Sequence, residues 1–136
     1  MTNTALTHTS LLVARILLGL LFLMAGLGKL GDVAGFGAFM ATGGIPAFLA
    51  WPVVLFEILA GVALIAGLQT RIVALALGAF CVASGLLYHF DLTDQMQTTQ
   101  LLKNLALAGG YIALAIAGPG ALSVDAKLGR ANPLPA

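Results

Sequence analysis

Four stretches of this chain are almost entirely apolar over roughly the twenty residues that an α-helix needs to cross the hydrocarbon layer of a membrane. They extend over residues 11–30, 51–68, 72–90 and 101–118. Because lipid offers no hydrogen-bond partners, the backbone of such stretches must form helices or a closed barrel. The strict alternation of apolar and polar residues that barrel strands show is missing. The sequence therefore predicts an all-α membrane protein, a four-transmembrane-helix antiparallel bundle.

Composition places the chain in the same class. Hydrophobic residues make up 60% and charged residues 8% of the 136, and the mean hydropathy is +1.06, which is outside the range of soluble globular domains. The lipid bilayer is therefore an expected partner. A net charge of +1 leaves no basic surface for a nucleic-acid backbone, so no nucleic-acid partner is expected. The single cysteine, Cys81, excludes an intrachain disulfide and a thiolate-rich metal site.

The connections between the stretches differ in length. Only residues 69–71 join the second stretch to the third, so these two should form an antiparallel hairpin. The first and second are separated by a glycine-rich segment in which Phe36, Phe39 and Met40 recur at roughly helical spacing. This pattern indicates a short amphipathic helix in the membrane interface, with a structured loop as the alternative. The whole chain, 1–136, is predicted to be a single membrane domain with a C-terminal tail over 119–136.

The distribution of Lys and Arg predicts the orientation of the bundle, because cytoplasmic loops carry an excess of both residues. One side of the four spans has four of them and the other side has two. The first set is Arg15, Arg71, Lys127 and Arg130, and the second is Lys29 and Lys103. We therefore expect a multi-pass protein of the inner (plasma) membrane with both termini in the cytoplasm.

Glu57, the only glutamate of the chain, lies inside the second apolar stretch. A carboxylate at membrane depth costs roughly 2.5–3.5 kcal/mol, so it normally faces other protein groups and finds a partner. Glu57 lies in the half of the bundle that we expect to face away from the cytoplasm. Other polar side chains belong to the same half, because Lys29 and His89 end apolar stretches there and Lys103 and Asn104 begin one. Glu57 can form a charge-assisted hydrogen bond with Lys29 or Lys103. This polar cluster is either a site for a ligand or a proton, or an ion pair that locks the helices together.

Three further residues are interpreted as structural or anchoring. Arg15, near the cytoplasmic side, is either an anchor that extends to the interface or a partner of Gln69. Arg71 begins the third stretch on the same side, and Trp51 marks the outer interface. The two histidines of the chain have no partners at metal-ligand spacing, so neither a metal nor a haem is expected. No catalytic residue is assigned.

Several blocks of the sequence carry a resemblance when they are taken in order. The run RILLGLLFLMAGLGKL extends from Arg15 to Leu30, and further blocks lie at 44–46, 67–71, 102–106 and 118–120, with Glu57 between them. Together they resemble the motifs of the DoxX family of small four-helix membrane proteins, over about residues 11–128. The resemblance implies a membrane subunit linked to quinone-dependent oxidoreductases, or an organiser of redox enzymes in thiol-stress and superoxide defence.

The leading hypothesis is a binding module for a quinone or a similar small ligand, in which the chain is a non-catalytic subunit of a quinone-linked oxidoreductase. Lys103, Asn104 or His89 would donate a hydrogen bond to a quinone carbonyl oxygen, and Glu57 would accept or relay a proton. Electrons would come from a partner redox enzyme. Two alternatives stay open. One is a scaffold whose Glu57–Lys pair fixes the bundle while its outer loops dock an oxidoreductase, and the other is a small transporter formed by a homo-oligomer.

Overall fold

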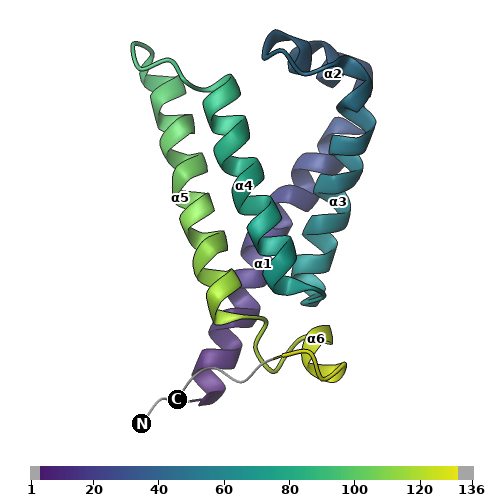
Figure 1. Cartoon of the computed structure of the whole chain (residues 1–136), viewed down its shortest axis with the longest axis vertical. Helices are drawn as coiled ribbons and strands as arrows, with labels where there is room; N and C mark the ends of the chain where they lie inside the picture. Colours follow the sequence, from purple (N-terminus) through teal and green to yellow (C-terminus); the bar gives the residue numbers. More distant parts are fainter. Residues whose placement is uncertain (1–3, 132–136) are drawn as a thin grey trace.

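The computed structural model describes residues 4–131 and contains helices but no strand in that range. Its elements are α1 (Thr4–Lys29), α2 (Val33–Thr42), the 3-10 turn η1 (Ala47–Leu49), α3 (Ala50–Ala66), α4 (Thr70–Tyr88), α5 (Gln95–Ala117) and α6 (Val124–Lys127). Within these residues, four helices are long and apolar enough to span a membrane: α1, α3 together with η1, α4 and α5. The predicted fold class is confirmed, and a short helix, α2, separates the first two spans (Figure 1).

The spanning helices form two antiparallel pairs that diverge like the arms of a V (Figure 1). α1 packs along α3, and α4 packs along α5. The turn between α3 and α4 joins the two arms at the narrow end, and the short connection does make these helices antiparallel. Away from the turn α3 and α4 separate, so the main packing partner of α3 is α1 and that of α4 is α5.

Glycines allow the close approach of α1 and α3, which together form the first arm of the V. A Cβ atom at Gly61 of α3 would lie 2.6 Å from the backbone nitrogen of Leu23, and one at Gly19 of α1 would lie 2.7 Å from the carbonyl oxygen of Gly61. No larger side chain fits at either position unless the helices move apart. This is the small-residue packing of membrane helices, in which close dispersion contacts replace the burial of apolar surface from water.

Two spans begin earlier than the apolar pattern predicts. α5 starts at Gln95 rather than near residue 101 because Asp94 caps it, its carboxylate accepting hydrogen bonds from the N–H groups of Met96 and Gln97. α1 starts at Thr4 rather than near residue 11, since its first turns are polar but contain no glycine or proline to end a helix. The other ends of α1, α3, α4 and α5, with η1 left aside, agree with the predicted ones to within two residues.

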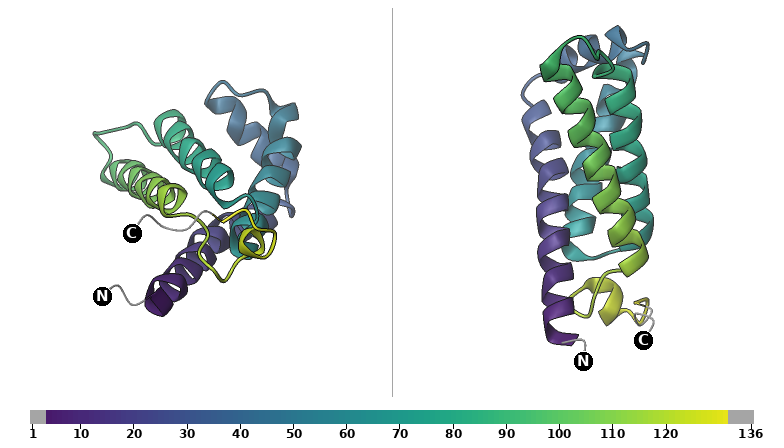
Figure 2. Two further views of the ribbon diagram at one scale, coloured as in Figure 1. Left: turned by 60° about the horizontal axis from the view of Figure 1, so that its bottom comes forward. Right: turned by 90° about the vertical axis from the view of Figure 1, so that its left-hand side faces the viewer.

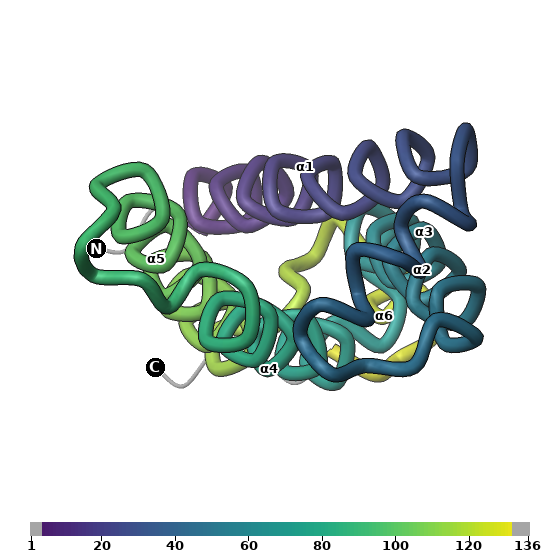
Figure 3. The backbone as a smooth tube through the Cα atoms, turned by 90° about the horizontal axis from the view of Figure 1, so that it is seen from above, coloured from purple at the N-terminus to yellow at the C-terminus, as the bar shows by residue number. Residues whose placement is uncertain are grey.

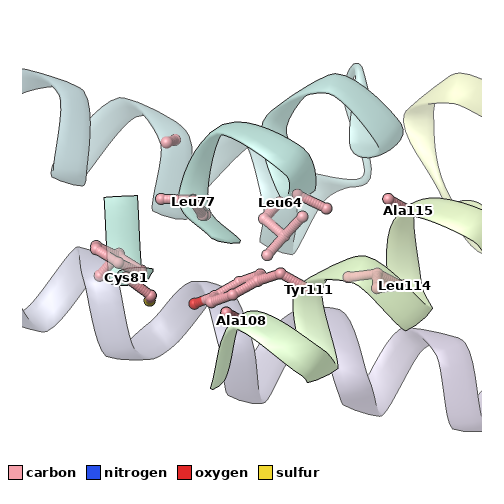
Figure 4. Close-up of a cluster of buried hydrophobic side chains, with 10 residues drawn as sticks. Leu64, Leu77, Cys81, Ala108, Tyr111, Leu114 and Ala115 are labelled. Carbon is pink, nitrogen blue, oxygen red and sulfur yellow. The ribbon is translucent and has the colours of Figure 1, made fainter. Parts of the chain in front are cut away.

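The hydrophobic core lies where the two arms meet (Figure 4). Leu64, Leu77 and Tyr111 are fully buried there, and Cys81 belongs to the same cluster as a buried free thiol. The Tyr111 hydroxyl donates a 2.8 Å hydrogen bond to the backbone carbonyl of Leu18. This bond ties α5 to α1 while it satisfies the one polar atom of a buried tyrosine.

Residues 119–131 of the predicted C-terminal tail contain a short helix, α6, and return to the bundle. After α5 the chain turns back under the narrow end of the V, where α6 lies beside the turn between α3 and α4 (Figure 2). The buried Asp125 carboxylate accepts hydrogen bonds from the N–H groups of Gln69, at 2.8 Å, and Thr70, at 2.9 Å. It thereby acts as the N-terminal cap that α4 lacks in its own sequence. Residues 132–136 of the predicted tail, like residues 1–3, lie outside the described residues.

The expectation for the partners of Arg15 is wrong. Its side chain is fully buried and donates hydrogen bonds to the backbone carbonyls of Ile65, at 3.2 Å, and Leu122. It has no hydrogen bond to Gln69 and no contact with solvent, because the returning C-terminal segment covers it. A cation at the end of α3 compensates the free carbonyl groups of the last helical turn. Arg15 therefore joins α1, the end of α3 and the C-terminal segment.

Candidate functional site

A cavity of about 430 Å³ lies between the two arms, in the half of the bundle away from the turn between α3 and α4. Its walls come from α1, α3, α4 and α5, and α2 lies over part of it at the wide end of the V (Figure 3). Most lining side chains are apolar, and four of them are phenylalanines: Phe22, Phe36, Phe39 and Phe80. Small-molecule sites typically have volumes of roughly 300–1,000 Å³ and apolar walls with a few polar groups. The cavity fits that description.

Lys29 and Glu57 form an ion pair on the wall of this cavity. The ammonium Nζ of Lys29 lies 2.8 Å from Oε1 and 2.7 Å from Oε2 of the Glu57 carboxylate, and 4.9 Å from the centre of the Phe36 ring. The Lys29 side chain is 27% exposed and the Glu57 side chain 4%. A carboxylate at this depth requires a partner, and the structure provides Lys29 rather than Lys103.

His89 and Asn104 also line the cavity, whereas Lys103 does not. His89 directly follows α4, and its Nδ1 lies 2.8 Å from Oε1 of Gln97. Asn104 packs against Gly85, and its side-chain amide has no hydrogen-bond partner among residues 4–131. Adjacent residues of a helix point about 100° apart, so Lys103 is exposed on the outer face of α5. The structure thus brings together four of the five predicted site residues.

Ser84 and Tyr88 of α4 line the cavity as well, although the sequence pattern did not identify them as site residues. The Tyr88 hydroxyl donates a 2.8 Å hydrogen bond to the backbone carbonyl of Met40, and its ring stacks on Phe39 with the centroids 4.8 Å apart. These contacts hold α2 against α4. The sequence did contain a signal for these two residues, because the helical spacing of Cys81, Ser84 and Tyr88 places the three on one face.

Arg71 and Trp51 lie away from the cavity. Nη1 of Arg71 donates to the carbonyl oxygens of Ala115 and Ile116, both at 2.7 Å, and so binds the last turn of α5, where a cation is favoured. Trp51 is 56% exposed in the first turn of α3. Both residues therefore serve the bundle and its surface and take no part in the cavity wall.

The charged groups at the narrow end contribute to the fold and are distant from the cavity. Burial acts to raise the pKa of Asp125, but the hydrogen bonds from Thr70 and Gln69 and the charge of Arg130 together outweigh it, so this pKa lies below its ordinary value. The carboxylate therefore stays ionised beside the start of α4. In the part of the chain that the structure describes, no three His, Cys, Asp or Glu side chains come close enough to share a metal ion.

Four apolar spans around a cavity at the wide end of the V define a small multi-pass membrane protein. The model of the DoxX family matches residues 10–90, and the chain belongs to the DoxX family. It is similar to the inner membrane protein YqjF of Escherichia coli, with 38% identity over 92% of this chain and 96% of the relative. It is also similar to the inner membrane protein YphA of the same organism, with 31% identity over 86% of this chain and 89% of the relative. No solved structure matches the chain.

Proposed function

We propose that this protein binds a quinone, or a similar flat molecule with hydrogen-bonding oxygen atoms, in the outer cavity and serves as the membrane subunit of a redox system. The observation that carries the proposal is the make-up of the cavity wall, in which aromatic and apolar side chains surround a few polar groups. A quinone ring would pack against Phe22 and Phe80, whose rings meet edge to face with centroids 5.6 Å apart.

The polar groups of the wall have distinct roles in this proposal. The Asn104 amide, which has no hydrogen-bond partner within residues 4–131, can donate to one carbonyl oxygen of the quinone, and His89 or Lys29 can donate to the other. Reduction of a quinone consumes protons, and Glu57, whose carboxylate lies 2.7 Å from the Lys29 ammonium on this wall, would accept protons from water and relay them to the quinone oxygen atoms. With one cysteine, the chain cannot form a redox disulfide by itself. Electrons would come from a partner enzyme.

The quinone content of the purified protein tests this proposal. We expect protein extracted in a gentle detergent to retain quinone, measured by solvent extraction and chromatography. Glu57→Gln and Asn104→Ala should each lower the occupancy without unfolding the bundle. Lys103→Ala is the matched control, because Lys103 precedes Asn104 but is exposed outside the cavity. Protein that neither retains nor takes up quinone, or equal occupancy in all three variants, would contradict the proposal.

A scaffold role is the second candidate, and the position of the ion pair favours it. Lys29 ends α1 and Glu57 lies on α3, so the pair joins the two helices of one arm. In a scaffold the pair would only fix the bundle, while the outer loops would dock an oxidoreductase. Glu57→Gln would then lower the thermal stability and leave the quinone content unchanged. That combination separates the two functions.

We also propose that both ends of the chain face the cytoplasm from an inner membrane, with the cavity near the outer face. The bias of Lys and Arg toward the end that carries α6 supports this orientation. Leu92, between α4 and α5, is 65% exposed at the cavity end. A cysteine at Leu92 in a Cys81→Ser background should react with an impermeant maleimide added to intact cells. Protection until the cells are lysed would reverse the orientation.

A further inference from the structure

The two sides of the V are closed to different extents. On the side of α3 and α4, the stacking of Phe39 on Tyr88 and the hydrogen bond from the Tyr88 hydroxyl to Met40 hold α2 across the gap. Phe36 and Ile45 line the cavity from the same segment. α2 and the residues that follow it therefore form an aromatic and apolar roof over this side of the cavity.

On the side of α1 and α5, the contacts occur toward the narrow end. The Tyr111 hydroxyl binds the Leu18 carbonyl, and the Tyr111 ring lies 5.9 Å from the Phe22 ring. Beyond Phe22 toward the outer end, no hydrogen bond, ion pair or ring contact joins α1 to α5 within residues 4–131. Figures 1 and 3 both show these two helices separating toward that end, with α2 lying on the α3 side. This side of the cavity has no roof.

The side chains along this opening are apolar and lie at membrane depth. Leu21 and Ala25 of α1 and Leu107 of α5 line the cavity, and Leu21 is 44% exposed. Leu21 precedes Lys29, the last residue of α1, by eight positions, a distance of about 12 Å at the helical rise of about 1.5 Å per residue. The opening therefore faces the acyl chains of the bilayer and lies below the level of the lipid headgroups.

We propose that the gap between α1 and α5 is a lateral portal, and that the ligand is an amphiphile dissolved in the bilayer which enters the cavity through it. This inference rests on the proposed ligand-binding function of the cavity. The polar head binds beside Glu57 and Asn104, and the apolar tail leaves the cavity between Leu21 and Leu107 into the surrounding lipid. A tail is part of the ligand class because the side chains that line the cavity at this portal, Leu21, Ala25 and Leu107, are apolar.

A photoreactive quinone tests the route. The probe carries a decyl tail with a terminal diazirine and is added to the full-length protein in phosphatidylcholine vesicles, with unlabelled decyl quinone as the competitor. After illumination, peptide mass spectrometry locates the adducts. We expect competable adducts on α1 and α5 around Leu21 and Leu107, and none around Leu59, which is 66% exposed elsewhere on the lipid-facing surface of α3.

The outcomes of this experiment separate the portal from the binding function. Competable adducts on α2 or α3 would overturn the portal while leaving quinone binding in the cavity intact. The absence of competable adducts from protein that also retains no quinone would overturn both. A route variant provides a second measurement: Ala25→Trp should slow the loading of quinone from vesicles severalfold, and Leu59→Trp should not. Equal loading rates in the two variants would also overturn the portal.

A second copy of the chain is the competing occupant of the gap. Leu21→Cys in a Cys81→Ser background distinguishes the two occupants when the protein in vesicles is oxidised with copper phenanthroline. Protein that stays monomeric agrees with an open portal, with Leu59→Cys in the same background as the control. Disulfide-linked dimers formed through position 21 and not through position 59 would show that protein fills the gap, and would overturn the portal.

Discussion

Removing the two members of the Lys29–Glu57 pair one at a time should cause unequal losses of stability. The Glu57 side chain is 4% exposed, whereas the Lys29 side chain is 27% exposed and can extend its ammonium toward water. Lys29→Met therefore leaves a buried carboxylate without a cation. Glu57→Gln leaves a partly hydrated ammonium beside a neutral amide of nearly the same shape. We expect Lys29→Met to be the more destabilising substitution.

Protonation of Glu57 limits how much free energy of unfolding the Lys29→Met variant can lose. Breaking a buried ion pair by removing one partner costs about 3–5 kcal/mol. The isolated Glu57 carboxyl can instead bind a proton, which costs about 3.7 kcal/mol near about pH 7 for a glutamate with an ordinary pKa of about 4.3, at about 1.36 kcal/mol per pH unit. Lys29→Met should therefore lower the free energy of unfolding by about 3–4 kcal/mol. Glu57→Gln should lower it by about 1–2 kcal/mol, the effect of a weakened hydrogen bond.

The same bound makes the loss in Lys29→Met depend on pH. Near about pH 5 the protonation of Glu57 costs only about 1 kcal/mol, so the penalty should shrink by about 2–3 kcal/mol between the two pH values. The sign follows from proton counting. The folded variant keeps a proton on the buried carboxyl that the unfolded chain has released, so lower pH favours the folded state.

Titration with SDS of the protein in dodecyl maltoside, followed by circular dichroism, measures these free energies. The double variant Lys29→Met/Glu57→Gln is the control, and it should lose at least about 1 kcal/mol less than the sum of the two single losses, because the two side chains are in contact. Equal losses in the single variants, or a loss in Lys29→Met that does not change with pH, would refute the description of Glu57 as a buried carboxylate that depends on Lys29.

Three further substitutions test the packing with the same titration. Asp125→Asn should cost about 1–3 kcal/mol of unfolding free energy, because backbone N–H groups lose a charged acceptor. The pKa of Asp125 is lowered in the folded state. The contribution of the wild-type carboxylate to stability should therefore be complete above the ordinary pKa of about 3.9 and disappear as the pH falls through the lower folded-state pKa. Gly61→Ala should cost about 2 kcal/mol or more by overpacking, since its Cβ would lie 2.6 Å from a backbone nitrogen, whereas Gly28→Ala, with nothing within 4 Å, should be neutral or stabilising. Tyr111→Phe should cost about 0.6–1.7 kcal/mol through the lost bond to Leu18.

The four spans could be predicted from sequence because lipid imposes them. A bilayer requires a long apolar run and an internally bonded backbone, and both requirements are visible in composition alone. The starts of α1 and α5 could not be predicted in the same way. The residues from Thr4 and from Gln95 that extend these helices are mostly polar, so a search for apolar stretches does not find them. The cap at Asp94 was a readable signal for α5.

The sequence was enough to predict at which depth of the bundle the polar residues lie, but not which of them are in contact. The order of the spans is enough to bring Glu57, Lys29 and Asn104 to one end of the bundle. Choosing Lys29 over Lys103 requires the rotation of each helix about its axis, and that rotation is hard to read from helices that are apolar on nearly every face. The burial of Arg15 was out of reach for another reason, because it depends on the return of a C-terminal segment distant in sequence.

The shape of the V follows from where small and large side chains lie, and the cavity follows from the shape. Within the first arm, Gly19 and Gly61 let the two backbones touch. Between the arms, Phe22 and Phe80 meet edge to face with their centroids 5.6 Å apart, and rings of this size keep the helices from closing on each other. Asp125 ties the C-terminal segment to the turn between α3 and α4, so the arms can diverge only toward the end away from this turn. A buried ion pair and a cavity therefore occupy the same level, since only there are the arms far enough apart to leave a space beside the charges.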